Sequence, residues 1–407
     1  MKKILAIILT LTMACMLLTG CGTKSNDKVG DNLKGTGSKN DTTSEGSDTS
    51  KSEDGKYEIA MITDKGNIDD KSFNQGTWEG VKKFAEENKI SHQYIKPEEA
   101  SDVGYLKAID NAVAAGAKVV VTPGYLFEVP VFTAQTKYPE VKFIILDGQP
   151  HTADYKTYKT ESNVACVLYN EEQSGYLAGY AAVKDGFTKL GFMGGMAVPA
   201  VQAYGYGYLQ GANAAATDMN LADAAVHCIY HYTGDFAETD TNKAAAKTMY
   251  QEGTEVIFAC GGSVGKSVMS AAKEANAKVI GVDVDQRYDS DTVITSAMKG
   301  LGASVITVLE SIYKTNKWTD YAGKTTYFNA SNNGVGLPTV VIGDEKGNAF
   351  DRFKTFDKAA YDAVYKTLSD GTAKPIREIK IKDKSGVATA DELVSGLNLK
   401  KVTIETR

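Results

Sequence analysis

A glycine-rich loop is the first stretch whose residues could do chemistry. Residues 261–267 read Gly-Gly-Ser-Val-Gly-Lys-Ser, between an apolar run at 256–259 and a helical pattern at 267–276. A strand, a glycine loop and a helix near Gly-Lys-Ser resemble a phosphate-binding P-loop, which would predict a nucleotide hydrolase. The P-loop pattern needs a glycine five residues before the glycine of Gly-Lys-Ser, and Cys260 stands there. The spacing therefore argues against nucleotide hydrolysis, which we keep only as an alternative.

Histidine and cysteine residues are too few and too scattered to predict a metal site. Only His227 and His231 lie four residues apart, in a predicted strand whose extended backbone separates them too far to chelate one ion. Beyond residue 21 the chain has three cysteines at wide spacing, which do not form a disulfide framework. We predict no metal and no cofactor, at least one free thiol, and buried apolar roles for Cys166, Cys228 and Cys260.

The elements that would position a site are predicted strands and helices that alternate along the chain. Short runs rich in β-branched residues fall at 57–63, 118–123, 141–147, 189–195, 256–259 and 278–283. Helical patterns fall between them at 72–88, 103–116, 171–184, 241–253 and 267–276, with Ser72 as the expected N-cap of the first. Apolar strands alternating with helices predict parallel sheets covered on both faces. We expect an α/β chain with two lobes, the second beginning near Cys166.

Ligands of open parallel sheets bind beyond the carboxyl ends of the strands. The segments that follow the predicted strands contain carboxylates, an asparagine, aromatic rings and glycines; they are 64–76, 124–128, Asp147, 194–208, 232–240, 261–267 and Asp283. No serine, histidine and acid set is found among them, and no residue there has the surroundings of an activated nucleophile. The sequence therefore favours a binding protein over an enzyme.

The N-terminus has the pattern of an export signal. Two lysines precede an apolar run at 4–18, which is shorter than the roughly 20 residues that span a bilayer. The run ends in Leu-Thr-Gly-Cys at 18–21, which resembles a bacterial lipoprotein signal. We expect residues 1–20 to be removed and Cys21 to be lipidated, which would anchor the chain to the outer face of the cytoplasmic membrane. An ordinary secretory leader is the alternative.

Residues 21–56 are expected to form a tether between the lipid and the folded part. Residues 22–56 contain no aromatic residue and only Val29 and Leu33 as sizeable apolar side chains, too few to offset the entropy of ordering. The whole chain has a net charge of −6 and no basic run, which makes nucleic acid a poor partner.

Five blocks of sequence carry a resemblance to a known family. They read DKGNIDDKSFNQGTWEG, FMGGMAVPAVQAYGYGYLQG, TGDFAETD, VIFACGGSVG and VIGVDVDQ, and they begin at residues 64, 192, 233, 256 and 279. In this order they resemble the basic membrane protein family (also called BMP or Med-like), lipoproteins of ABC-transporter type that include the purine nucleoside receptor of spirochaetes. The resemblance runs from residue 57 to about residue 299 and is weaker beyond it.

The resemblance implies a fold and a function. The fold would be two Rossmann-like lobes with parallel sheets, of periplasmic-binding-protein type I, hinged and discontinuous in sequence. One lobe would hold 57–165 and about 286–345, and the other 166–285 and about 346–407. The protein would capture purine nucleosides outside the membrane and deliver them to an ABC permease with its cytoplasmic ATPase. The same fold binding a sugar or another small metabolite stays an alternative.

For the base, the resemblance implies two stacking rings and a polar edge. Phe73 and Phe236 match the rings that enclose the base, one from each lobe. Asn74 matches the amide that reads the purine edge, Asp64 a further polar contact, and Asp147 another acid on the base side. The alternatives are a core position for Phe73, a surface anchor for Phe236 and helix caps for the two acids.

For the pentose, the resemblance implies backbone and charged contacts. Gly261 and Gly262 would let the backbone approach the ribose. Asp283 would accept hydrogen bonds from ribose hydroxyls, with Asp285 as its rival, and Lys299 would donate one. Tyr204 stands where the family often has phenylalanine, so its hydroxyl would either reach the ligand or face water.

Overall fold

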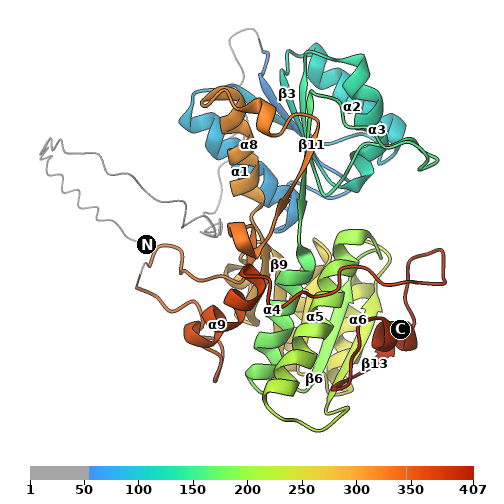
Figure 1. The fold of residues 1–407 in the computed structure, drawn as a ribbon, viewed down its shortest axis with the longest axis vertical. Helices are drawn as coiled ribbons and strands as arrows, with labels where there is room; N and C mark the ends of the chain where they lie inside the picture. Colours follow the sequence, from blue (N-terminus) through green and yellow to red (C-terminus); the bar gives the residue numbers. More distant parts are fainter. Residues whose placement is uncertain (1–54, 345) are drawn as a thin grey trace, which may run out of the picture. The chain divides into compact units, whose positions relative to one another are not determined.

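The first of two sheets is built mostly from strands of the N-terminal part of the chain (Figure 1). The computed structural model describes residues 55–344 and 346–407. Within them the first sheet has six strands in the order β11-β5-β4-β3-β1-β2, all paired in parallel. The strands are β1 (Ile59–Ile62), β2 (His92–Ile95), β3 (Val119–Pro123), β4 (Lys142–Leu146), β5 (Val164–Tyr169) and β11 (Lys324–Phe328).

Helices cover both faces of the first sheet. They are α1 (Phe73–Glu87), α2 (Asp102–Ala114), α3 (Glu128–Lys137) and α8 (Leu301–Tyr313), with the 3-10 turns η1 (Tyr125–Phe127) and η3 (Trp318–Asp320). Successive residues of β1 point to opposite faces: Ile59 and Met61 pack in the core that contains α1 and α8, whereas Ala60 and Ile62 pack in the core that contains α2 and α3. Burial on both faces explains why the strands read as continuous apolar runs.

The second sheet has seven strands within the described ranges, in the order β12-β10-β9-β8-β6-β7-β13. They are β6 (Lys189–Gly194), β7 (Val226–Tyr232), β8 (Val256–Cys260), β9 (Lys278–Asp283), β10 (Val293–Lys299), β12 (Val335–Gly336) and β13 (Val402–Thr406). Only β12 runs antiparallel to its neighbour among these residues.

The helices of the second half are α4 (Glu171–Lys184), α5 (Pro199–Asp218), α6 (Asp240–Gln251), α7 (Val264–Ala275), α9 (Lys358–Ser369) and α10 (Ala390–Gly396), with the 3-10 turns η2 (Gln286–Tyr288) and η4 (Ala330–Asn332). α4 and α5 pack so closely that a Cβ on Gly179 would lie 1.9 Å from the carbonyl oxygen of Tyr208. Glycine is therefore required for this approach, and the pair forms a rigid unit.

The chain passes between the two sheets three times within the described part. It crosses from β5 into α4, from β10 into α8, and from β11 into β12, so each lobe is discontinuous in sequence. Our expected boundaries are near 165, 286 and 345. Strand pairing places the first two crossings later, because β5 pairs with β4 in the first sheet and β10 pairs with β9 in the second. It places the third crossing earlier, because β11 pairs with β5 and β12 pairs with β10. We propose that the lobes divide at these crossings.

Most predicted elements are confirmed, with small shifts at their ends. Each of the six predicted strands is present, and α7 begins at Val264, three residues before the expected start at 267. The predicted leader (1–20) and nearly all of the predicted tether (21–56) lie outside the described residues, as does Cys21. Of the helices that are described, none has the length and apolar character to cross a membrane.

Candidate ligand-binding site

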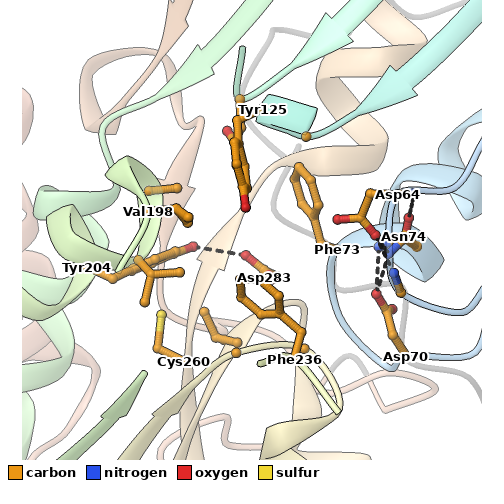
Figure 2. Close-up of a pocket in the computed structure, with 18 of the residues that line it drawn as sticks. Asp64, Asp70, Phe73, Asn74, Tyr125, Val198, Tyr204, Phe236, Cys260 and Asp283 are labelled. Atoms are coloured by element: carbon orange, nitrogen blue, oxygen red, sulfur yellow. Dashed lines mark hydrogen bonds between the residues drawn. The ribbon is translucent and has the colours of Figure 1, made fainter. Parts of the chain in front are cut away.

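A cavity lies where the carboxyl ends of both sheets meet (Figure 2). It encloses about 770 Å³ of space, part of it open to solvent. The structure brings all nine residues that we predicted as ligand contacts to its wall; they are Asp64, Phe73, Asn74, Asp147, Phe236, Gly261, Gly262, Asp283 and Lys299. Its wall is built by residues of both lobes, and small-molecule sites occur preferentially at such interfaces between domains.

The wall contains residues that the sequence did not single out as contacts. These are Gly66, Asp70, Gly124, Tyr125, Val198, Pro199, Ala200, Val201, Tyr204, Cys260, Ser263 and Val282. Ten of these twelve lie in the segments 64–76, 124–128, 194–208 and 261–267 that follow strands, so position beyond a strand end was the signal that could have found them. Tyr125 is the largest omission. It lies in η1 just after β3, and its hydroxyl approaches the sulfur of Met196 at 4.0 Å, a residue of the other lobe.

Aromatic rings come to the cavity from both lobes. Phe73 is the first residue of α1, whereas Phe236 lies in the connection between β7 and α6, and both side chains are half-buried. Figure 2 shows these rings and Tyr125 around one open space. A Cβ on Gly195 would lie 2.5 Å from two atoms of the Phe236 ring, so this glycine makes room for the ring.

A cluster of Asp64, Asp70 and Asn74 forms one polar edge of the cavity. The side-chain amide of Asn74 donates to Asp64 Oδ1 at 2.8 Å and to Asp70 Oδ2 at 2.9 Å, and its oxygen accepts from the backbone N–H of Asp64 at 3.1 Å. Both amide hydrogens are therefore used within the protein. In this arrangement Asn74 can offer a ligand only the second lone pair of its oxygen. The carboxylates of Asp64 and Asp70 line the cavity as further acceptors.

The N-terminus of α1 is capped by Asp70 and not by Ser72. Asp70 accepts the backbone N–H groups of Ser72 at 2.9 Å, Asn74 at 2.9 Å and Gln75 at 3.1 Å. Burial raises the pKa of the Asp70 carboxyl to about 6, although these hydrogen bonds oppose the rise. Ser72 occupies the predicted N-cap position of α1, but its side chain makes no capping hydrogen bond, because its hydroxyl donates instead to Asp283 Oδ2 at 2.5 Å.

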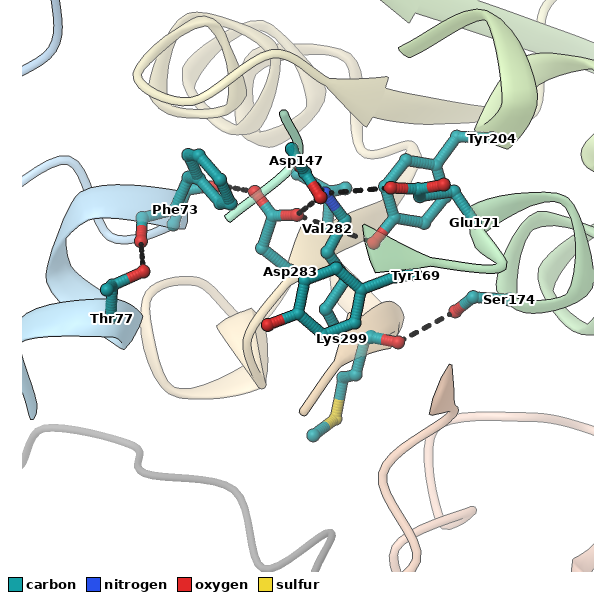
Figure 3. A network of polar contacts seen from close by, with 12 residues as sticks. Phe73, Thr77, Asp147, Tyr169, Glu171, Ser174, Tyr204, Val282, Asp283 and Lys299 are labelled. Carbon is teal, nitrogen blue, oxygen red and sulfur yellow. Dashed lines mark hydrogen bonds and ion pairs between the residues drawn. The ribbon is translucent and has the colours of Figure 1, made fainter. Parts of the chain in front are cut away.

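Lys299 lies at the centre of a buried ion cluster (Figure 3). Its ammonium contacts the carboxylate of Asp147, and it lies 3.3 Å from Glu171 Oε1 and 3.8 Å from Asp283 Oδ1. Burial lowers the pKa of Lys299, but the three carboxylates outweigh burial and raise that pKa above its usual range. The side chain is therefore a fixed ammonium.

Aromatic faces surround the same ammonium. The Lys299 nitrogen lies 4.8 Å from the ring centroid of Phe73, 5.3 Å from that of Tyr169 and 5.4 Å from that of Tyr204. The Tyr204 hydroxyl donates to Asp283 Oδ1 at 3.4 Å, so this departure from phenylalanine places a hydroxyl on a cavity acid and not in water.

Asp147 and Asp283 have the same unusual backbone conformation. They have φ angles of 54° and 65°, in the left-handed region that non-glycine residues rarely adopt, and each stands at the end of a strand. Such strain clusters at functional sites. Asp147 Oδ1 is buried without a hydrogen-bond partner among the described residues, which leaves an acceptor at the cavity wall. Burial raises the pKa of Asp147 to about 7.

The two lobes are held together across the cavity by direct contacts. Besides the Ser72–Asp283 hydrogen bond and the Asp147–Lys299 ion pair, the side chain of Gln286 donates to the carbonyl of Lys71 at 2.7 Å. Each of these contacts joins a residue of the first lobe to a residue of the second.

The glycine-rich loop does not have the geometry of a P-loop. Lys266 is half-buried, does not line the cavity, and donates to the carbonyl oxygen of Asp69 at 3.1 Å. A Cβ on Gly261 would lie 2.8 Å from the backbone nitrogen of Gly195, so packing alone requires this glycine. The placement of Lys266 gives no support to the hydrolase alternative.

The same loop contains a Gly-x-Ser-x-Gly pattern at 261–265, which in some hydrolases holds a nucleophilic serine on a strained turn. Ser263 has φ −67° and ψ −9°, which is unstrained helical geometry. The histidines make their contacts elsewhere, His92 with Ile90, His151 with Glu128 and Thr152, His227 with Thr403, and His231 with Arg407. Ser263 therefore lacks the geometry of an activated nucleophile.

The three cysteines of the described residues lie in the interior of the protein. Cys166, Cys228 and Cys260 are buried free thiols, which confirms the apolar role expected of them. Burial raises the pKa of the Cys166 thiol to about 11. Within residues 55–344 and 346–407, no group of three or more histidine, cysteine, aspartate or glutamate side chains is placed to hold a metal ion.

Comparison with known proteins extends these observations to a family. Residues 57–385 match the family described as "ABC transporter substrate-binding protein PnrA-like". The chain is 31% identical over 302 residues to the "ABC transporter nucleoside-binding protein BmpA" of Lactococcus lactis subsp. cremoris, covering 68% of this chain and 80% of the relative. It is 30% identical over 314 residues to "Basic membrane protein A" of Borreliella burgdorferi, covering 76% and 86%.

A solved structure supports the fold. An ABC transporter solute-binding protein from Aeropyrum pernix K1 superimposes with a TM-score of 0.69 at 21% identity, covering 84% of this chain and 99% of that protein. The two discontinuous parallel-sheet lobes are thus those of the periplasmic-binding-protein class. With the family match over residues 57–385, the chain belongs to the PnrA-like, or basic membrane protein, family of ABC-transporter substrate-binding proteins.

Proposed function

We propose that the protein captures a purine nucleoside outside the cytoplasm and delivers it to an ABC permease. The observation that carries the proposal is the shared cavity, in which Phe73 and Phe236 come from opposite lobes and acids lie on both sides of them. A nucleoside joins a flat base to a pentose rich in hydroxyls, and the wall offers a matching surface for each part. The name of the Lactococcus relative, a nucleoside-binding protein, supports this class of ligand.

The base would lie between the two rings. Stacking of an aromatic side chain on a nucleobase contributes about 1–3 kcal/mol and does not depend on the identity of the base. Identity would be read at the edge formed by Asp64 and Asn74. Because both amide hydrogens of Asn74 already bind Asp64 and Asp70, we propose that Asn74 holds the acids in place and that Asp64 makes the direct contact.

The pentose would lie on the acids at the strand ends. The resemblance assigns Asp147 to the base side, but Lys299 contacts both Asp147 and Asp283, so we propose that both acids accept hydrogen bonds from ribose hydroxyls. Asp147 has a buried oxygen without a partner among the described residues. Lys299 would hold these acids and donate to the ligand. Gly261 and Gly262 would bring backbone N–H groups close to the sugar.

The proposed cellular setting follows from the N-terminus and the family. Residues 1–20 would be a leader, and lipidated Cys21 would hold the protein at the outer face of the cytoplasmic membrane. The partners would be a permease and its ATPase, which supplies the energy for transport. The binding protein itself would make and break no covalent bond.

A ligand screen tests the proposal. The purified protein is heated with nucleosides, free bases, nucleotides and sugars, and a ligand at 100 times its dissociation constant should stabilise the fold by about 2.7 kcal/mol. We expect stabilisation by guanosine or inosine. Stabilisation by sugars alone would favour the sugar-binding alternative and contradict the nucleoside proposal.

Calorimetry with Phe73→Ala then tests the site itself. Loss of the stacking face should weaken guanosine or inosine binding at least tenfold. Phe84, which is buried in the same helix and faces Tyr313 at 5.8 Å, provides the matched control. Phe84→Leu should lower stability and leave affinity unchanged. Unchanged affinity in Phe73→Ala would remove this ring from the site.

A further inference from the structure

Arg377 lies outside the cavity wall but contacts the network that reaches it. The residue belongs to the segment between α9 and α10, and its side chain is 27% exposed. Its Nη1 donates to the carbonyl oxygen of Tyr169 at 2.8 Å, to Glu171 Oε2 at 2.5 Å and to Glu172 Oε2 at 2.8 Å. One nitrogen therefore binds the end of β5 and the first two residues of α4, where the chain first crosses between the lobes.

Glu171 connects this arginine to the cavity. Its side chain is only 1% exposed, and it is not a residue of the cavity wall. One carboxylate oxygen accepts from Arg377, and the other lies 3.3 Å from the ammonium of Lys299. Burial opposes ionisation, but Arg377 and Lys299 hold the pKa of Glu171 below its usual range. Glu171 is thus a buried anion balanced by one cation on each side.

From this arrangement we infer that Arg377 and Glu171 are positioning residues for the ligand-binding ammonium of Lys299. Lys299 has three carboxylates within reach, those of Asp147, Asp283 and Glu171. The ammonium lies 3.3 Å from Glu171 and 3.8 Å from Asp283, so it already contacts the buried acid. By binding the other oxygen of Glu171, Arg377 limits how strongly Glu171 attracts the ammonium away from the two cavity acids. The C-terminal segment of the chain would therefore set the geometry of the sugar-binding side.

The balance of charge around Glu171 explains why Arg377 should affect the position of Lys299. Removing one partner of a buried ion pair leaves an uncompensated charge, which is strongly unfavourable. Without Arg377, Glu171 would have Lys299 as its remaining cation and would compete for it with Asp147 and Asp283. The cavity acids would then repel each other more strongly and lose their fixed orientation.

Arg377→Gln tests this inference by calorimetry with inosine, a readout that rests on the proposed function. We expect affinity to fall at least fivefold. Because all three hydrogen bonds come from one nitrogen, a lysine ammonium with its three donors can replace them, so Arg377→Lys should recover most of the affinity. Glu171→Gln, which keeps the shape of the side chain, should weaken binding in the same way even if Arg377→Gln does not fold.

A second readout needs no ligand. In protein labelled with ¹⁵N-lysine, the buried ammonium of Lys299 should give a distinct signal, identified by its absence from Lys299→Arg. Arg377→Gln should shift or broaden this signal, and Arg377→Lys should restore it. If the native protein binds no nucleoside, the proposed function fails, and this signal alone decides whether Arg377 positions Lys299.

Arg352 provides the matched control. It is half-buried in the same C-terminal region, but its Nη1 donates only to the backbone carbonyls of Ser290 at 3.0 Å and Val293 at 2.6 Å among the contacts described. Arg352→Gln should lower thermal stability without changing affinity or the Lys299 signal. If Arg377→Gln behaves like Arg352→Gln, with affinity within twofold and the signal in place, Arg377 is structural only and the inference is overturned.

Discussion

The hydroxyl of Ser72 donates a 2.5 Å hydrogen bond to the carboxylate of Asp283, across 211 positions of sequence and between the two lobes. Ser72 precedes α1, where a serine usually caps its own helix, whereas Asp283 ends β9 at the cavity. Asp70 caps α1 in its place. The hydroxyl of Ser72 is thus free to join the two lobes at the cavity.

Ser72→Ala should weaken the closed state and not the helix. A hydrogen bond to a charged group contributes about 1.5–3 kcal/mol, so we expect nucleoside affinity to fall by roughly tenfold or more, through faster dissociation. Stopped-flow fluorescence measures the dissociation rate. Ser101 is the control, because its hydroxyl does cap α2 by accepting from Gly104 at 3.1 Å. Ser101→Ala should cost about 1 kcal/mol of stability and leave dissociation unchanged; an unchanged rate in Ser72→Ala would contradict the closing role.

Gly195→Ala should displace the Phe236 ring, because the new Cβ would lie 2.5 Å from its atoms. We expect about a tenfold loss of nucleoside affinity, close to the contribution of one stacking face. Calorimetry compares it with Gly265→Ala, a nearby substitution in α7 whose Cβ would meet no atom closer than 3.8 Å. Equal affinities for the two variants would show that Phe236 does not hold the ligand.

Asp147 should make nucleoside affinity depend on pH. Burial raises its pKa to about 7, although Lys299 lowers it, while Glu171 and Asp283 add to the rise. The ionised carboxylate accepts ribose hydroxyls better than the acid, so affinity should increase as the pH rises through about 7. Calorimetry across this range should find the increase reduced in Asp147→Asn. Asp154→Asn, at an acid 53% exposed, should retain it.

Stability should change in the opposite direction over the same range. A carboxyl whose folded pKa is raised from 3.8 to about 7 stabilises the fold fully below the lower value, and this contribution is lost as the pH rises through the higher one. The melting temperature of the ligand-free native protein should therefore decline more than that of Asp147→Asn between these values. If the melting temperatures of the two proteins declined equally over this pH range, Asp147 would be ionised throughout it.

Lys266→Ala should have little effect. The side chain is half-buried and its one described hydrogen bond is to the carbonyl of Asp69, so we expect affinity within about threefold and stability within about 1 kcal/mol of the native protein. A phosphate-release assay should find no ATP hydrolysis that depends on this lysine. Hydrolysis that Lys266→Ala abolishes would revive the P-loop alternative.

The strands could be predicted from sequence where both faces are buried, as in β3 and β4, because burial makes them continuously apolar. β2, with one buried residue in four, and β11, with none, lack this signal and were missed. The buried strands β5 and β10 were missed as well, and the run of β10 is interrupted by Thr295, Ser296 and Lys299. Edge strands are recognised by their hydrogen-bonding neighbours, and those neighbours are known only after folding.

The chain order by itself determined which residues could form the site, since residues just after parallel strands must gather at one edge of a sheet. Asp147 and Asp283 were identifiable for this reason, whereas Phe73 was identified through the resemblance to the family. Only the tertiary structure decided their partners. The pairing of Ser72 with Asp283 and of Arg377 with Glu171 joins residues 211 and 206 positions apart. Buried charges take whichever counter-charge the packing brings within reach, and no local pattern encodes that distance.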